Sequence, residues 1–178
     1  MAGADPRRFP SSSVVRPRAA RVSAPALVLV ALLVLAGVAG AAGWGGITPG
    51  ESTRRDVEAR YGRPTQERAV TEGGLTGSEW TYGGAQAPAG LDRLVVGFGL
   101  LRRGTFVPEL VRVVMLYPKP RVFTVPELIA GWGKPDGIGT DQQSGRSILR
   151  WEARGILAAL DQKEEFAEVL VFAPEQAQ

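Results

Sequence analysis

The sequence has no cysteine and no histidine among its 178 residues, and these two absences exclude several classes of protein. Without cysteine there is no disulfide, no thiolate nucleophile and no lipidated N-terminal cysteine of the kind that anchors bacterial lipoproteins. Without histidine there is no imidazole base, and the loss of both residues removes the usual zinc ligands. We therefore expect no metal site and no cofactor, and we expect that the protein is not an enzyme.

A basic excess is also missing from most of the chain, although the net charge is +3. Residues 1–43 contain five arginines and one aspartate, whereas residues 44–178 contain 16 Lys and Arg against 17 Asp and Glu. The high isoelectric point therefore belongs to the N-terminal segment. Because the rest of the chain has no basic bias, no nucleic-acid partner is expected.

Charge is absent altogether from residues 22–42, which are almost entirely apolar or small. Residues 22–43 are predicted to be a transmembrane anchor or a signal peptide, since the run reaches the roughly 20 residues that a membrane span needs and contains Ala39-Gly40-Ala41, which suits signal cleavage. Residues 1–21 are rich in Arg, Pro and Ser and are predicted to be a disordered basic cytoplasmic segment. The positive-inside rule then places the body outside the cytoplasmic membrane, either single-pass anchored or, after cleavage, periplasmic or secreted.

A twelve-residue motif occurs twice, at residues 53–64 and 124–135, with a constant offset of 71. Each copy has a Thr, an acid three residues later, an aliphatic residue and then an aromatic-Gly-x-Pro ending. The Thr and the acid predict a capping box at the start of a helix. The Gly and the Pro are typical of a helix end. Each copy therefore predicts a short helix with one apolar face, which needs a sheet to pack on.

Three strands are predicted after each helix, from short apolar or alternating stretches separated by turn residues. The predicted fold class is α+β, with two tandem helix–β–β–β repeats in which short helices pack on antiparallel sheet, preceded by an N-terminal hydrophobic helix. The repeats cover residues 44–118 and 119–178. The predicted strands lie at residues 77–83, 91–101, 108–117, 147–152, 156–160 and 166–172.

The first repeat resembles the SmpA/OmlA (BamE-like) domain family in Ile47-Thr48-Pro49-Gly50, Tyr61-Gly62-Arg63-Pro64 and Glu79-Trp80-Thr81-Tyr82. The resemblance covers residues 47–117 well and 122–173 more loosely. Its type members are envelope lipoproteins that support outer-membrane β-barrel assembly, although this chain lacks their cysteine. The resemblance implies a non-catalytic cell-envelope scaffold that binds another envelope protein.

The tandem arrangement also resembles the β-lactamase inhibitory proteins, although their disulfides are absent here. This second resemblance implies the alternative function, a secreted inhibitor of an extracytoplasmic enzyme such as a β-lactamase. Neither resemblance implies a small-molecule substrate. The membrane, through residues 22–43, and another envelope protein are the expected partners.

The candidate binding surface is the face of the sheet that we expect to point away from the helices. The residues assigned to the helix side are Trp80, Val96, Val113, Trp151, Ala158 and Val169, with Trp151 matched to Trp80 by the offset of 71. The opposite face then interleaves apolar residues with Arg and Glu, which is typical of a surface that binds protein. The predicted contact residues are Arg112, Val114, Leu116, Arg150, Glu152, Glu168, Leu170 and Phe172.

Overall fold

Both capping motifs form the helices that they predict. In the computed structural model, which describes residues 42–174, helix α2 spans Arg54–Tyr61 and helix α3 spans Val125–Trp132. Asp56 accepts hydrogen bonds from the backbone N–H and the hydroxyl of the Thr that precedes α2, at 2.8 and 2.7 Å. Glu127 does the same in front of α3, at 3.0 and 2.8 Å. Each carboxylate therefore holds the first turn of its helix.

Both helices end on a glycine with a positive φ, 74° at Gly62 and 84° at Gly133. A side chain at φ > 0 costs energy, so glycine is the natural residue here. A buried aromatic residue from the sheet donates to the carbonyl of each glycine, Tyr82 Oη at 3.0 Å and Trp151 Nε1 at 2.9 Å. Burial raises the pKa of Tyr82 to about 12, so its hydroxyl keeps the proton that it donates.

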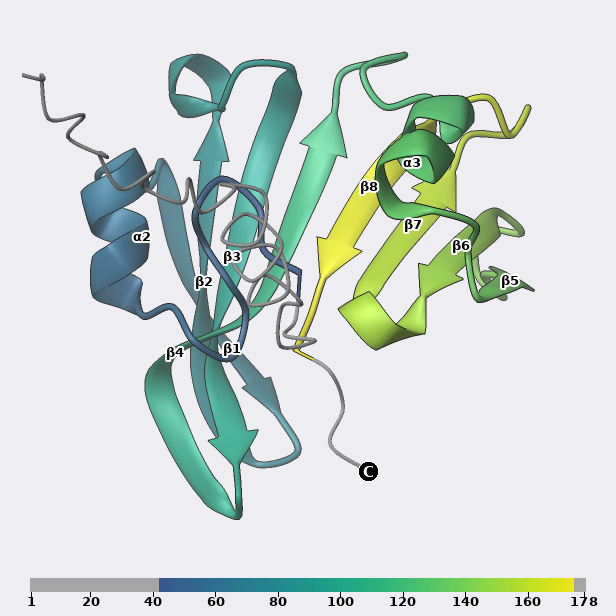
Figure 1. Cartoon of the computed structure of the whole chain (residues 1–178). Helices are drawn as coiled ribbons and strands as arrows, with labels where there is room; N and C mark the ends of the chain where they lie inside the picture. Colours follow the sequence, from purple (N-terminus) through teal and green to yellow (C-terminus); the bar gives the residue numbers. More distant parts are fainter. Residues whose placement is uncertain (1–41, 175–178) are drawn as a thin grey trace, which may run out of the picture. The chain divides into compact units, whose positions relative to one another are not determined.

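Eight strands form one antiparallel sheet in the order β1-β2-β3-β4-β8-β7-β6-β5, with α2 and β1–β4 in the first half of the chain and α3 and β5–β8 in the second (Figure 1). Hairpins join consecutive strands within each half, and the two halves meet where β4 pairs with β8. The strands are β1 (Gln66–Glu72), β2 (Leu75–Gly83), β3 (Leu91–Arg102), β4 (Thr105–Pro118), β5 (Gly137–Thr140), β6 (Ser147–Trp151), β7 (Ile156–Leu160) and β8 (Ala167–Phe172).

The predicted fold class is wrong, because the described chain is mostly β and each helix is followed by four strands, not three. The missed strand in each half is the one at the edge of the sheet. β1 has the sequence Gln-Glu-Arg-Ala-Val-Thr-Glu, which carries no apolar alternation because neither of its faces is deeply buried. β5 is Gly-Ile-Gly-Thr, whose glycines read as a loop. The predicted N-terminal hydrophobic helix lies outside the described residues.

The expectation of a transmembrane helix is likewise corrected. The α-helices of residues 42–174 have eight residues each, and none is long and apolar enough to cross a bilayer. Apart from its last two residues, the predicted anchor or signal peptide at 22–43 lies outside that range, as does the predicted disordered segment at 1–21.

The two halves are related by an approximate twofold axis through the middle of the sheet. Val114 pairs with Phe172, and Leu116 pairs with Leu170. Each residue of β4 corresponds to the residue of β8 that lies 56 positions later, so Val114 matches Leu170 and Leu116 matches Phe172. The pair Val114–Phe172 is therefore the counterpart of the pair Leu116–Leu170. The axis therefore passes between Met115 and Val171, which pair with each other at the centre of the β4–β8 ladder.

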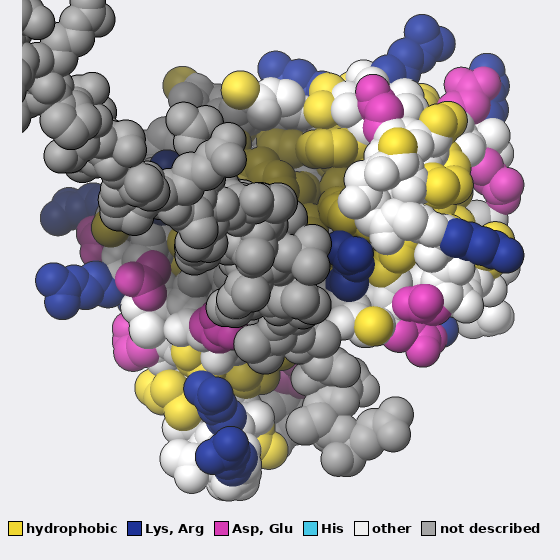
Figure 2. Space-filling view, viewed as in Figure 1, with side chains coloured by type: hydrophobic (Ala, Val, Ile, Leu, Met, Phe, Trp, Pro, Cys, Tyr) yellow, Lys and Arg dark blue, Asp and Glu magenta, His cyan; other side chains and the backbone are white. Residues whose placement is uncertain are grey.

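The hydrophobic core lies on one face of this sheet, and both helices pack there. Val57 of α2 and Leu128 of α3 belong to the same buried cluster as the sheet residues. From this helix side, Figure 2 shows hydrophobic side chains in the upper middle of the view and charged side chains around the margin. The largest completely buried side chains of the sheet are Tyr82, Leu94, Val96, Phe98, Val111, Val114, Leu116, Ile156, Leu170 and Phe172.

Candidate protein-binding surface

Four of the predicted contact residues point into the core, so they are withdrawn from the surface. Val114, Leu116, Leu170 and Phe172 are each at most 1% exposed and face the helices. Val113 and Val169, which were assigned to the core, lie on the opposite face. The error has a physical cause, because residues 110–116 are apolar at every position except Arg112 and therefore show no alternation.

The face opposite the helices is called the open face below. It carries the side chains that alternate along each strand with the side chains of the core. Its central row runs across six strands, and the members of the row pair in sequence. Leu157 in this row is 38% exposed, whereas Val95 is 7% exposed. The row is Thr81, Val95, Met115, Val171, Leu157 and Arg150.

The open face is therefore largely aliphatic at its centre, although it carries no helix. Val113 lies next to this row, and Val169, Ala159 and Ile148 form a further short row across β8, β7 and β6. These side chains are only partly buried, unlike their neighbours in the core. An antiparallel sheet with one solvated face normally carries mainly polar side chains there. The aliphatic field is thus unusual for a face that is exposed to water alone.

Two β-bulges place a charged residue on the open face of each half. Gly97 pairs with Val113 and Phe98 with Val111, so Arg112 is the extra residue of β4. The same irregularity in β7–β8 leaves Glu168 as the extra residue of β8. Arg112 and Glu168 occupy equivalent positions, since they too are 56 residues apart. A bulge turns a side chain away from the regular alternation, and here it exposes a charge beside the aliphatic field.

Each bulge residue forms an ion pair, and the two pairs have opposite polarity. Arg112 donates to Glu72 of β1 at 3.1 Å, and Glu168 accepts from Arg146. Arg112 and Glu168 are 33% and 31% exposed, so both pairs are accessible. Two of the predicted contact residues thus lie on the open face as predicted, but the structure provides each with a partner that the sequence did not reveal.

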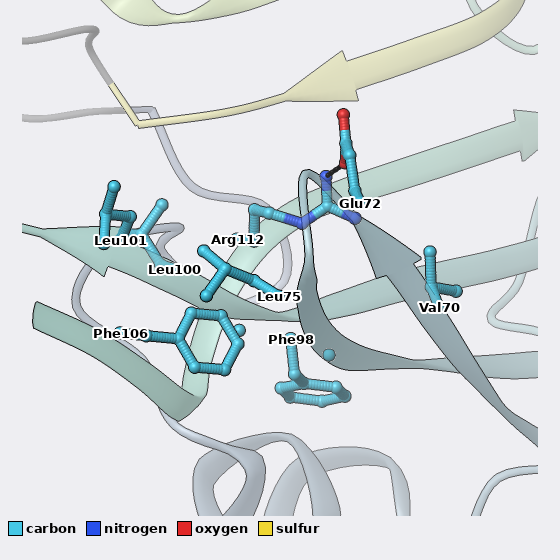
Figure 3. A pocket seen from close by; sticks show the side chains of 10 residues that line it. Val70, Glu72, Leu75, Phe98, Leu100, Leu101, Phe106 and Arg112 are labelled. Atoms are coloured by element: carbon cyan, nitrogen blue, oxygen red, sulfur yellow. Dashed lines mark hydrogen bonds and ion pairs between the residues drawn. The ribbon is translucent and has the colours of Figure 1, made fainter.

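A groove of about 520 Å³ lies on the open face at the Arg112 end. A second hollow of about 290 Å³ adjoins it at the base of the β3–β4 hairpin, and the two share Val70, Glu72, Leu100 and Arg112. Figure 3 shows the guanidinium of Arg112 facing the carboxylate of Glu72, with Leu75 lying toward Phe106. The walls of the groove are mainly apolar, and Glu79 closes one side. They include Val70, Glu72, Glu79, Val113, Met115 and Pro174.

Glu79 is one of two buried charged residues in the part of the chain that the structure describes, and it is neutralised across the β1–β2 ladder. Both Nε and Nη2 of Arg68 donate to its Oε2, at 2.8 and 2.5 Å. Glu79 is 7% exposed, so removal of Arg68 would leave a carboxylate that is poorly solvated. This pair holds the groove wall in place.

Two further predicted contact residues are exposed on the second half. Arg150 lies at the end of the central row, and its Nη2 is 3.2 Å from the position that a side chain on Gly139 would take. Glu152 lies in the short 3-10 helix η2 (Glu152–Arg154) after β6 and is also exposed. Arg112, Arg150, Glu152 and Glu168 are therefore exposed or partly exposed.

Asp56, Glu164 and Asp161 have structural roles. Asp56 caps α2, and Glu164 accepts a hydrogen bond from Ser147 at 2.5 Å in the β7–β8 turn. Within residues 42–174, no three acidic side chains are grouped so as to hold a metal ion. Asp161, which is 8% exposed, organises the same turn by accepting from the backbone N–H groups of Glu165 and Phe166.

No family model matches the chain, and no curated protein matches it. Among solved structures, it is similar to the DUF4309 family protein YjgB of Bacillus subtilis, with a TM-score of 0.47 and 14% identity over 72% of this chain and 82% of that one. A likeness at this level carries no inference about function. The resemblance to the SmpA/OmlA family stays a prediction.

Proposed function

We propose that this protein is a non-catalytic binding module that holds another protein against the open face of its sheet. The observation that carries the proposal is the aliphatic field around Met115 and Val171. Burying such a field against a partner is favourable by roughly 25 cal/mol for each Å² of apolar surface removed from water. While it stays in contact with water, this apolar surface adds no stability to the fold, because the core lies on the other face of the sheet.

The charges around the field support a protein partner over a lipid surface. Arg112 and Glu72 lie at one end of the open face, and Arg146 and Glu168 form a pair on the second half. A rim that carries both signs around an apolar centre is typical of protein interfaces, in which the rim selects the partner and the centre supplies the affinity. The predicted location outside the cytoplasm rests on residues 1–43 and stays a prediction.

Cross-linking from the open face tests the proposal. Benzoylphenylalanine is placed at Leu157 in the full chain in its own cells, and the captured protein is identified and purified. Its Kd is then measured for the parent chain and for Arg112→Glu and Leu157→Asp. Each change should weaken binding by about tenfold or more, as expected for the loss of an interfacial anchor.

The matched control is Arg103→Glu at the tip of the β3–β4 hairpin, where the side chain is exposed and lines neither groove of the open face. Figure 2 shows basic side chains at the foot of the view, where Figure 1 places this turn. The control should leave Kd within about twofold. A captured partner whose Kd is the same for the parent and for both open-face variants would refute the proposal.

A further inference from the structure

The two edge strands of the sheet, β1 and β5, have the same position in the fold but different chemistry. Residues of α2 and β1 correspond to the residues of α3 and β5 that lie 71 positions later in the sequence. The N–H of Thr65 donates to the carbonyl of Thr81, and the N–H of Asp136 donates to that of Arg150, which fixes the match at both edges. Arg54, Glu58 and Glu67 in the first half then correspond to Val125, Ile129 and Ile138 in the second.

The first edge is closed by charge on both faces. On the helix side, Arg54 donates to Glu67 at 2.7 Å and to Ser78 at 2.6 Å. On the open side, Arg68 is paired with Glu79. Charged side chains along an edge strand discourage another strand from pairing with it, because addition would desolvate them. β1 is thus protected against strand addition.

The second edge carries no charge on β5 itself. Ile138 is 75% exposed, the most exposed large hydrophobic side chain of the described residues, and Ile129 on α3 is 40% exposed. Their counterparts Glu58 and Glu67 line one groove of about 370 Å³ between α2 and β1. The same place beside β5 is therefore flanked by two isoleucines instead of two glutamates.

The backbone of β5 is also accessible. No described strand pairs with its outer edge, its register with β6 is unbroken, and it contains no proline. Gly137 has nothing within 4 Å of the position that a side chain would take. An added strand would therefore find unpaired N–H and C=O groups and free space on the open side.

The charged side chain that lies over β5 on the open face is basic. Arg150 lies over Gly139 and forms no ion pair with any residue of 42–174. The two acids that flank β5 serve the chain itself. Asp136 accepts from the N–H of Glu152 at 2.8 Å, and Asp141 accepts from the hydroxyl of Ser144. An acidic side chain on an incoming strand would meet Arg150.

We propose that β5 is a strand-addition site for an extended segment of a partner protein in which aliphatic residues alternate with acidic ones. The aliphatic residues pack beside Ile129 and Ile138 on the helix side, and an acidic residue pairs with Arg150 on the open side. Main-chain hydrogen bonds provide affinity and the alternating side chains provide selection, as in other cases of strand addition. A second copy of this chain fits less well, because antiparallel β5–β5 pairing would bring two Arg150 side chains to one junction. The proposal does not depend on the open-face function.

The test uses the full chain and two fluorescein-labelled peptides, one of alternating Val and Glu and one of alternating Val and Lys. The Val/Glu peptide should bind, as measured by fluorescence anisotropy, and the Val/Lys peptide should bind at least about tenfold more weakly. The double variant Val125→Arg/Ile138→Glu copies the Arg54–Glu67 pair into the second half and should weaken Val/Glu binding by about tenfold or more. Ile138→Asp provides a second variant should the double variant fail to fold. Ala69→Glu on β1 is the matched control and should leave binding unchanged.

Four results would overturn the proposal. Three of them concern the peptides: the Val/Glu peptide does not bind, its binding survives both β5 variants in folded protein, or the Val/Lys peptide binds equally well. The fourth is dimerisation of the free chain that Ile138→Asp abolishes, since the occupant would then be a second copy.

Discussion

The two halves of the sheet share a fold but treat their edges in opposite ways. The first half neutralises Arg54, Glu67, Arg68 and Glu79 in pairs around β1. The second half has aliphatic residues or glycine at the matching places and leaves Ile138 exposed. The two halves share the core, the helix caps and the central β4–β8 ladder. At other matching positions they carry different side chains, as the two edges show.

The largest expected effect tests whether the two cores are equivalent. Phe172→Ala and its counterpart Leu116→Ala remove completely buried side chains that face the helices. The free energy of unfolding, measured by urea denaturation, should fall by about 3–5 kcal/mol for Phe172→Ala and about 2–5 kcal/mol for Leu116→Ala. A loss below about 1 kcal/mol at either position would show that it is not core.

The next effect tests the difference between the halves at one pair of matched positions. The guanidinium of Arg54 lies 4.9 Å from the Trp80 ring and 5.0 Å from the Phe98 ring, and its side chain is 26% exposed. Arg54→Met should lower the free energy of unfolding by about 1.5–3 kcal/mol, because charged hydrogen bonds and ring contacts are lost. At the matching position, Val125→Met should change it by less than about 1 kcal/mol. Equal losses would contradict the contrast between the edges.

A smaller effect tests what the halves share. Thr53→Ala and Thr124→Ala each remove a capping hydroxyl in front of a helix. Each should cost about 0.5–2 kcal/mol in thermal or urea unfolding, with similar values in the two halves. A cost confined to one of them would show that the two caps are not equivalent.

The smallest expected effect is the pH dependence of the free energy of unfolding, to which each capping carboxylate contributes. Hydrogen bonds from Thr53 and Thr124 lower the pKa of Asp56 and Glu127 below their ordinary values of 3.8 and 4.5. A carboxyl with a depressed folded pKa stabilises the fold above its unfolded pKa and loses that contribution as pH falls through the folded value. The free energy of unfolding should therefore fall as pH drops below about 4.5.

The same scan on the variants provides the control for this pH dependence. Thr53→Ala and Thr124→Ala should each flatten the fall in part, since each removes the hydroxyl bond to the carboxylate and keeps the backbone N–H bond. A pH profile that both substitutions leave unchanged would show that the two hydroxyl bonds do not contribute to it.

The sequence was sufficient to predict the caps, the buried strands and the antiparallel pairing within each half, because these features depend on local residue patterns. It could not predict the edge strands, whose side chains face water on both sides or are absent. It also could not predict the face of β4. Val111 and Val114 lie on the same face although they are three residues apart, because the bulge at Arg112 intervenes. An odd spacing in a uniformly apolar strand cannot be assigned to a face without its partner strand.

The duplicated capping motif forms a helix in each half, but the tryptophans of the two halves were matched wrongly. Trp151 corresponds to Tyr82, not to Trp80, because both donate to the carbonyl of the glycine that ends the preceding helix. The β5–β6 hairpin is two residues shorter than the β1–β2 hairpin, and this difference changes the offset between the halves from 71 to 69. The candidate surface was therefore predicted in part, since its charged members were identified and its aliphatic centre was not.

Amide hydrogen exchange of the full chain, with and without the Val/Glu peptide, tests the contrast between the edges most directly. The account predicts slower exchange at residues 137–140 of β5 in the presence of the peptide and unchanged exchange at residues 66–72 of β1. Slowing on β1, or on neither strand, would contradict it.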